Sequence, residues 1–163
     1  MSRLVVVPVI VPLIAAALAL LLRAHRNAQR AVSVVSLTAS TAAAAALVVH
    51  AAVDGPAVAR LGGWSSAIGI TYVADRLAAV MLAISALTML IVLLYAIGQR
   101  LGDESSPFYH PAYLILAAGV SMAFLTGDLF HLFVSFELLL MSSYVLMMLH
   151  GSEAQIRSGT TYV

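Results

Sequence analysis

An apolar stretch of 39 residues, 111–149, is the feature that most limits how this chain can fold. A helix needs about 20 apolar residues to cross the ~30 Å hydrocarbon core of a bilayer, so a single helix here would be nearly twice as long as required. Within the stretch, residues 126–128 (Thr-Gly-Asp) favour a turn, because glycine permits it and Asp128 can cap a following helix. We therefore predict two membrane-spanning helices, 111–126 and 129–149, joined by a tight turn.

The composition extends this prediction to the whole chain. Hydrophobic residues make up 63% of it and charged residues only 9%, whereas about a quarter of the residues of a soluble domain are charged. Three more apolar stretches are long enough to span a bilayer: 4–22, 31–53 and 77–97. The sequence thus predicts an all-α membrane protein with five transmembrane helices, forming a single membrane domain over residues 1–163. Cysteine is absent, which excludes disulfides and thiolate chemistry.

The segment 54–75 differs from these spans. Glycine and proline are frequent in it, and they precede the β-prone run 70–73, Ile-Thr-Tyr-Val. Trp64 and Tyr72 suit the headgroup layer of a membrane. This pattern predicts a small β-hairpin lying on the membrane surface, although an irregular loop fits it about as well.

The arginines predict the orientation, since cytoplasmic loops of membrane proteins carry an excess of basic residues. The chain has eight basic residues, all of them arginine. On one side of the predicted spans lie Arg23, Arg26, Arg30, Arg100 and Arg157. On the other side lie Arg3, Arg60 and Arg76. We therefore expect the first loop in the cytoplasm and the N-terminus outside.

Glu137 is the residue that most directly indicates a function. It lies near the middle of the predicted span 129–149, where a carboxylate costs about 2.5–3.5 kcal/mol. Such groups commonly carry protons or neutralise a passing ion. The alternative is a protonated carboxyl that bonds to a neighbouring helix and serves only in packing. No lysine exists in the chain and no arginine lies inside a span, so a positive partner for Glu137 must come from another chain or from sequence beyond this one.

Helical spacing places the polar residues of span 129–149 on two stripes. One stripe contains Glu137, Met141, Tyr144 and Met148, and the other contains His131, Ser135 and Ser142. Both stripes should face protein or water, because lipid cannot satisfy polar groups. His131 could pass protons between Glu137 and the outside, although a lone histidine near an interface is more often a hydrogen-bonded structural residue.

The remaining polar residues lie at span ends. We expect Asp128 to cap the helix that follows it, and Asp75 to favour the start of span 77–97 through the helix dipole. An Asp75–Arg76 ion pair and a gating role for these two residues stay open alternatives. Four histidines at span ends should lie in the membrane interface, and their spacing is not that of metal ligands: His25, His50, His110 and His150. No nucleophile–base pair, phosphate loop or haem spacing is present, so we expect no catalytic residues, metal or cofactor.

Two stretches carry a resemblance to a known family. Residues 119–146, GVSMAFLTGDLFHLFVSFELLLMSSYVL, closely resemble the fourth and fifth helices of the D subunit of Mrp-type multisubunit sodium/proton antiporters. Residues 62–82, GGWSSAIGITYVADRLAAVML, are similar to the surface hairpin and third helix of the same protein. The resemblance covers essentially the whole chain. Antiporter-like subunits of respiratory complex I and membrane-bound hydrogenases share a glutamate in this helix, so they belong to the same superfamily.

The resemblance implies that the chain is a subunit of a monovalent cation (sodium)/proton antiporter, a secondary transporter and not an enzyme. It implies that Glu137 is the key acid of a proton channel and pairs with a lysine on a later helix. The implied partners are other subunits of the complex, the implied ions are protons and Na⁺, and the implied location is the bacterial cell membrane. Full members carry two inverted five-helix repeats and more, so we expect this chain to be a truncated or split product, or a fragment, and to be incomplete alone. His131 stands where the family commonly has asparagine.

Two other functions are compatible with the same residues. The chain could be a proton-translocating membrane subunit of a complex I-like NADH/quinone oxidoreductase or of a hydrogenase. It could also be a non-transporting subunit that assists assembly, in which Glu137 serves only in packing.

Overall fold

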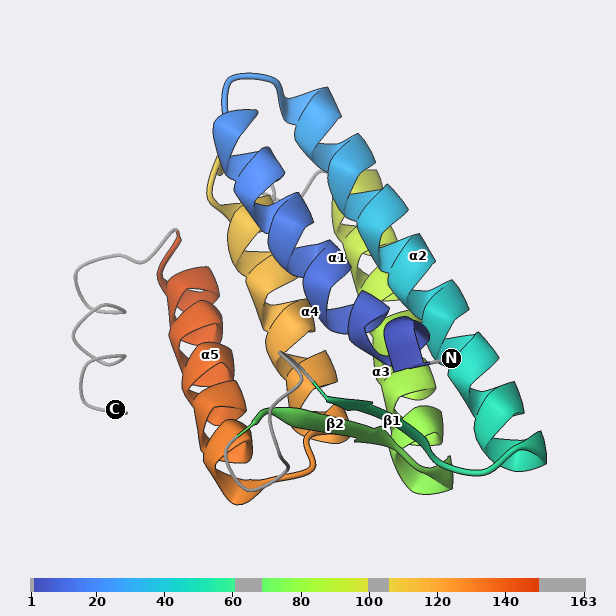
Figure 1. Cartoon of the computed structure of the whole chain (residues 1–163). Helices are drawn as coiled ribbons and strands as arrows, with labels where there is room; N and C mark the ends of the chain where they lie inside the picture. The colour runs from blue at the N-terminus through green and yellow to red at the C-terminus, as the bar shows by residue number, and fades with distance from the viewer. Residues whose placement is uncertain (1, 61–68, 100–105, 150–163) are drawn as a thin grey trace.

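Five helices and a two-stranded sheet make up the part of the chain that the computed structural model describes, residues 2–60, 69–99 and 106–149 (Figure 1). The helices are α1 (Ser2–Leu21), α2 (Arg26–Val53), α3 (Arg76–Gln99), α4 (Tyr109–Leu125) and α5 (Leu129–Met148), and the strands are β1 (Ala57–Arg60) and β2 (Thr71–Ala74). Four helices are long and apolar enough to cross a membrane, and α4 is a shorter apolar helix of 17 residues. The predicted all-α membrane fold with five apolar helices is confirmed.

The helix ends differ from the predicted spans mainly at their polar termini. Helix α2 begins at Arg26, five residues before the predicted start at 31, because hydropathy marks where the apolar core begins and not where the backbone becomes helical. Helix α4 begins at Tyr109, so that Pro111 lies in its first turn, where a missing backbone N–H costs little. The predicted break between the last two helices is confirmed, with α4 ending at Leu125 and α5 beginning at Leu129.

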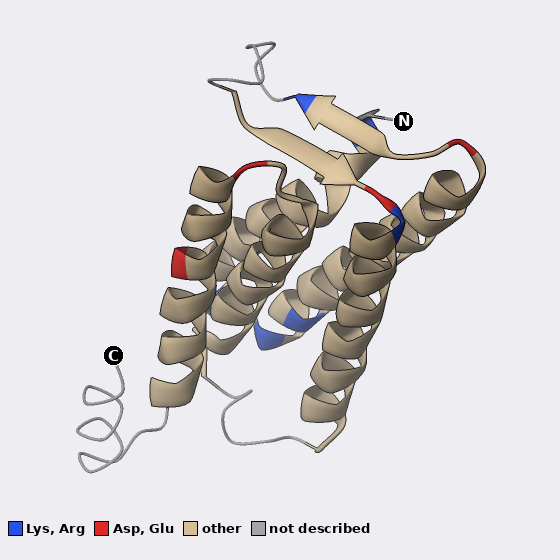
Figure 2. Cartoon of the chain, turned by 90° about the horizontal axis from the view of Figure 1, so that it is seen from below, with Lys and Arg blue, Asp and Glu red and all other residues tan. Residues whose placement is uncertain are grey.

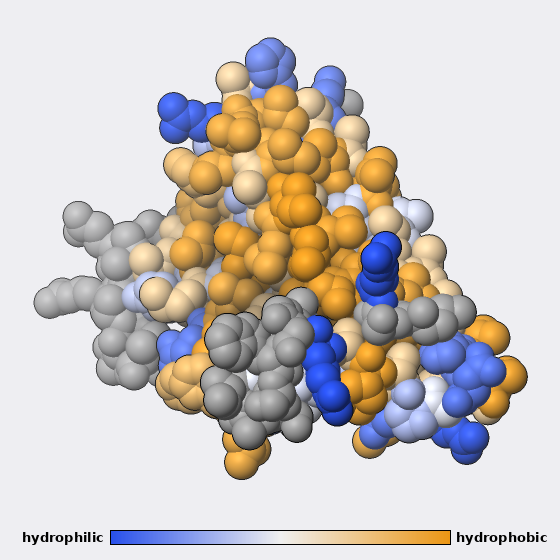
Figure 3. Space-filling model, viewed as in Figure 1, coloured by the Kyte–Doolittle hydropathy of each residue, from blue (hydrophilic) through white to orange (hydrophobic). Residues whose placement is uncertain are grey.

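The helices pack as a bundle in which α1 lies against α2 and α4, α2 lies against α3, and α5 lies against α4 (Figure 1). One apolar cluster, near the sheet, includes Val9, Leu47, Leu82 and Leu125. A second cluster, towards the other end of the bundle, is centred on residues such as Leu114. Many of the buried positions are alanine, which lets helices approach closely in lipid. On the outside, apolar side chains cover the middle of the bundle (Figure 3).

The predicted pairing of strands is confirmed: β1 and β2 are antiparallel, with Ala57 opposite Ala74 and Arg60 opposite Thr71, and the position of this hairpin on the membrane surface stays a prediction. The sheet lies across one end of the helix bundle, beside the start of α3 and the turn between α4 and α5 (Figure 2). Its inner face buries alternate residues of each strand, such as Ala59 and Tyr72, against the helix ends. Trp64 lies outside the described residues. We call this side of the bundle the hairpin end.

Candidate functional site

The turn between α4 and α5 is built by three consecutive residues. The Asp128 carboxylate accepts a hydrogen bond of 2.6 Å from the backbone N–H of His131, which confirms the predicted cap of α5. The Thr126 hydroxyl donates to the carbonyl oxygen of Asp128 at 3.0 Å. The first bond satisfies a backbone N–H that has no partner within the helix, whereas the Asp128 carbonyl oxygen also accepts the first helical bond, from the N–H of Leu132 at 3.1 Å.

This turn docks on strand β2. The backbone N–H of Gly127 donates to the carbonyl oxygen of Thr71 at 2.8 Å, and Thr126 forms an isolated antiparallel bridge with Tyr72. A side chain at position 127 would not fit, because an added Cβ atom would lie 2.9 Å from the Thr71 oxygen and 3.1 Å from Val73 Cγ2. The close approach of the strand therefore requires glycine at this position.

A buried polar pair joins β2 to the first turn of α5. His131 Nε2 lies 2.9 Å from the hydroxyl oxygen of Tyr72, and the two rings meet edge to face with centroids 5.0 Å apart. The exposed fraction of both residues is small, 4% for His131 and 3% for Tyr72. Burial, aided by the negative charge of Asp128, raises the pKa of the Tyr72 hydroxyl above its ordinary value. The phenol therefore stays protonated and available for hydrogen bonding at ordinary pH.

One of the two predicted stripes of α5 faces the protein. His131, Ser135 and Ser142 are the buried residues of this helix, as expected. The Ser135 hydroxyl donates to the His131 carbonyl oxygen at 2.7 Å, and the Ser142 hydroxyl donates to that of Leu138 at 2.6 Å. These bonds within the helix satisfy the hydroxyls without a partner on another helix.

Glu137 lies on the other side of α5. It is exposed in this chain, as is Met141 on the same stripe, and Tyr144 is half-buried. Glu137 is six positions after His131, so the two side chains leave α5 in directions about 120° apart. The structure therefore does not bring these two predicted members of a proton route together. That the stripe of Glu137 faces protein or water stays a prediction.

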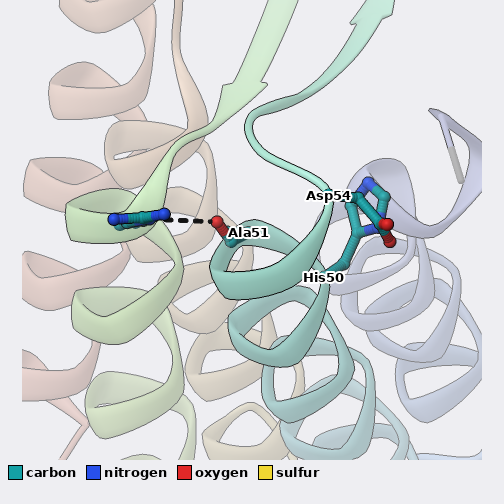
Figure 4. A network of polar contacts seen from close by, with 4 residues as sticks. His50, Ala51 and Asp54 are labelled. Carbon is teal, nitrogen blue, oxygen red and sulfur yellow. Dashed lines mark hydrogen bonds and ion pairs between the residues drawn. The ribbon is translucent and has the colours of Figure 1, made fainter.

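A second group of polar contacts connects α2 and α3 at the hairpin end (Figure 4). The Asp75 carboxylate accepts from the backbone N–H of Ala78 at 2.7 Å and so caps α3. The Arg76 guanidinium instead reaches α2, where Nε donates to the carbonyl oxygen of Ala51 at 3.2 Å and Nη2 to that of Ala52 at 3.4 Å. Among the ion pairs of the described residues, Asp75 and Arg76 do not form one with each other.

The sequence interpretation missed one side-chain hydrogen bond in this group. His50 Nδ1 lies 2.7 Å from the Asp54 carboxylate near the end of α2 (Figure 4). Their spacing of four residues, which brings side chains together on a helix, could have indicated it. Within the described ranges, no three His, Cys, Asp or Glu side chains gather as a metal site would require.

No protein-family model matches this sequence. Over 163 residues, all of this chain, it is 34% identical to the D subunit of the Na⁺/H⁺ antiporter of Alkalihalophilus pseudofirmus and likewise 34% identical to that of Bacillus subtilis. A putative antiporter subunit of Staphylococcus epidermidis is 30% identical over 165 residues. A solved structure of the Mrp complex from a Dietzia species superimposes with a TM-score of 0.89 at 30% identity, over 99% of this chain and 31% of the matched one.

Over its whole length the chain is therefore similar to the D subunits of Na⁺/H⁺ antiporters and to a chain of the Mrp complex. It spans about a third of the length of these curated relatives (33%) and corresponds to their N-terminal part. Four of its helices are long and apolar enough to cross a membrane, which makes it a multi-pass membrane protein. An archaeal membrane-bound sulfane sulfur reductase also superimposes, with a TM-score of 0.90 at 22% identity, over 99% of this chain and 33% of the matched one. At that identity the likeness shows the fold alone.

Proposed function

We propose that this chain works as part of a monovalent cation/proton antiporter, together with the other subunits of a membrane complex in a bacterial cell membrane. The similarity to the D subunits of Na⁺/H⁺ antiporters over the full length of the chain carries this proposal. It makes the chain part of a secondary transporter and not of an enzyme, with protons and Na⁺ as the transported ions.

Within this function, we assign proton exchange to Glu137. It is the one acidic residue of α5 and lies near the middle of that 20-residue helix. An ionisable group at that depth of a membrane costs free energy, and such groups usually have a function. None of the ion pairs among the described residues includes it. A cationic partner that comes from outside the described residues would favour the charged form of Glu137, and its withdrawal would favour proton uptake.

The other predicted site residues have supporting places in this proposal. Asp128 and His131 lie at the hairpin end of α5, Asp75 and Arg76 hold the start of α3, and Tyr144 shares the stripe of Glu137. The hairpin end faces outside in the orientation that the arginines predict, with the N-terminus also outside.

The deciding experiment is the Glu137→Gln substitution in the native assembly, reconstituted in membrane vesicles. Glutamine keeps the size of the side chain and its hydrogen bonding but cannot release a proton, so sodium-driven proton flux should be lost while the complex stays assembled. Met141→Leu on the same exposed stripe is the matched control and should keep its flux. Normal flux in the Glu137→Gln complex would reject the assignment. An unassembled Glu137→Gln complex would show that the carboxyl serves in packing.

A further inference from the structure

Helix α5 lies at the edge of the bundle. Among the described elements, α4 is the only one with which it packs extensively, and Gly119 of α4 permits the close approach to Leu139. The fully buried residues of α5 are three polar ones, His131, Ser135 and Ser142, and the apolar residues that it packs on the bundle, such as Leu138 and Leu146, are only partly buried. Contacts at the end of the helix can therefore add to those with α4 in setting the direction of Glu137.

Strand β2 supplies such contacts at the hairpin end. Two of them, the Gly127–Thr71 hydrogen bond and the Thr126–Tyr72 bridge, involve the backbone just before the helix and fix where α5 begins. The third, between Tyr72 and His131, involves a side chain that projects from the helix itself. A contact made by a side chain lies away from the helix axis and resists rotation of the helix about that axis. A contact made by the backbone before the first turn lies closer to the axis and resists rotation weakly.

We propose that the hydrogen bond between Tyr72 and His131 anchors α5 to the surface hairpin and so sets the direction in which Glu137 projects. His131 is then a positioning residue, Tyr72 is its partner, and the hairpin is part of the transport machinery. A rotation of α5 by about 20° would move a side-chain tip about 5 Å from the axis by roughly 2 Å. Displacements of that size are large for a group that must meet a partner at hydrogen-bond distance.

The geometry favours this role for His131 over proton transfer to Glu137. The two side chains project from different faces of α5, and the polar groups next to His131 on its own face are serine hydroxyls bonded within the helix. Proton transfer needs a ring that gains and loses protons. Positioning needs only a group that keeps the bond to the Tyr72 hydroxyl, which an amide can also do.

This difference gives the experiment. Four variants are compared in the native assembly: Tyr72→Phe, His131→Leu, the double variant and His131→Gln. The first reading is the distance distribution between spin labels at Val53→Cys of α2 and Leu129→Cys of α5. Both positions are exposed, and the chain has no other cysteine. The cysteines of the other subunits are replaced beforehand. The second reading is sodium-driven proton flux as a function of pH. This reading tests the positioning of Glu137 only if the proposed transport function is right.

Tyr72→Phe and His131→Leu should each broaden the distance distribution and lower flux about tenfold, and the double variant should lose no more than either alone. His131→Gln should keep both the native distances and the native pH profile. Unchanged distances in both Tyr72→Phe and His131→Leu would overturn the proposal, as would native distances with a lost or shifted pH profile in His131→Gln. Tyr72→Phe removes a single oxygen atom, so it tests the bond even where His131→Leu does not fold. If Glu137→Gln keeps its flux, the transport proposal fails. The distances between the spin labels still show whether the Tyr72–His131 bond anchors α5.

Discussion

The backbone of Gly127 lies against the carbonyl oxygen of Thr71, with an N–O distance of 2.8 Å and no room for a Cβ atom between them. Through this contact the turn that separates two membrane helices rests on a surface strand. The strand in turn precedes α3, so one short element connects the ends of three helices. Substitutions at this contact should therefore change the stability of the whole hairpin end.

The Gly127→Ala substitution should lower the free energy of unfolding. Its Cβ atom would lie 2.9 Å from the Thr71 oxygen, so the turn or the strand must move, at a cost of about 1–3 kcal/mol. Unfolding of the purified protein in mixed detergents measures this change. Gly98→Ala near the end of α3 is the control: outside its own helix backbone and chain neighbours, no atom of the described residues lies within 4 Å of its added Cβ, and alanine favours a helix over glycine. Equal stability of the two variants would contradict the close contact.

The Arg76→Gln substitution should loosen the junction of α2 and α3. The guanidinium donates to the carbonyl oxygens of Ala51 and Ala52, which belong to the last turn of α2 and lack partners within that helix. A cation at a helix C-terminus is also favourable. Because Arg76 is exposed, the expected loss in the free energy of unfolding is only about 0.3–1 kcal/mol.

A smaller loss in high salt would support the charge contribution to this Arg76 contact. The control is Arg60→Gln on β1, which is also exposed and should leave the unfolding free energy nearly unchanged. A loss at Arg60 as large as that at Arg76 would contradict a specific role for the two α2 carbonyls.

At the opposite end of the bundle, Gln29 should be the most sensitive polar residue. It is fully buried, and its Nε2 donates to the carbonyl oxygen of Ala19 at 2.7 Å and to that of Pro107 at 2.9 Å. Gln29→Leu leaves both acceptors unpaired and should cost about 2 kcal/mol of unfolding free energy.

Gln29→Glu should be worse than Gln29→Leu, since it places an acceptor where two carbonyl oxygens need a donor. The exposed Gln99 at the end of α3 is the matched control, and Gln99→Leu should change little. Thermal denaturation in detergent ranks the three variants. A Gln29→Glu protein as stable as the native one would contradict the bonding described.

The sequence was sufficient to predict the features that depend on local patterns. The length of an apolar stretch predicts a membrane helix, residues 126–128 predict a turn, and an aspartate at position 128 predicts a helix cap. Each of these depends on a few neighbouring residues and the membrane. The extra first turn of α2 was missed, because charged residues outside the hydrocarbon core carry no hydropathy signal.

Contacts between distant residues could not be predicted in this way. Tyr72 and His131 are 59 positions apart, and no local spacing indicates that they meet. The same holds for Arg76 and its acceptors on α2, which neighbour it only because α2 and α3 pack side by side. Helical periodicity did place Glu137 and His131 on different stripes of α5. Which stripe is covered by the chain depends on α4 and β2, and only the structure gives that.

The orientation of the chain can be tested with single cysteines, since the native sequence has none. Pro56 follows α2 at the hairpin end, and His25 lies between α1 and α2 at the other end; both are exposed. The arginine distribution predicts that the hairpin end faces outside. A membrane-impermeant maleimide should therefore label Pro56→Cys in intact cells, and should label His25→Cys only after the membrane is opened. The reverse pattern would place Arg23, Arg26 and Arg30 outside, and would also move the Tyr72–His131 contact to the cytoplasmic side of the membrane.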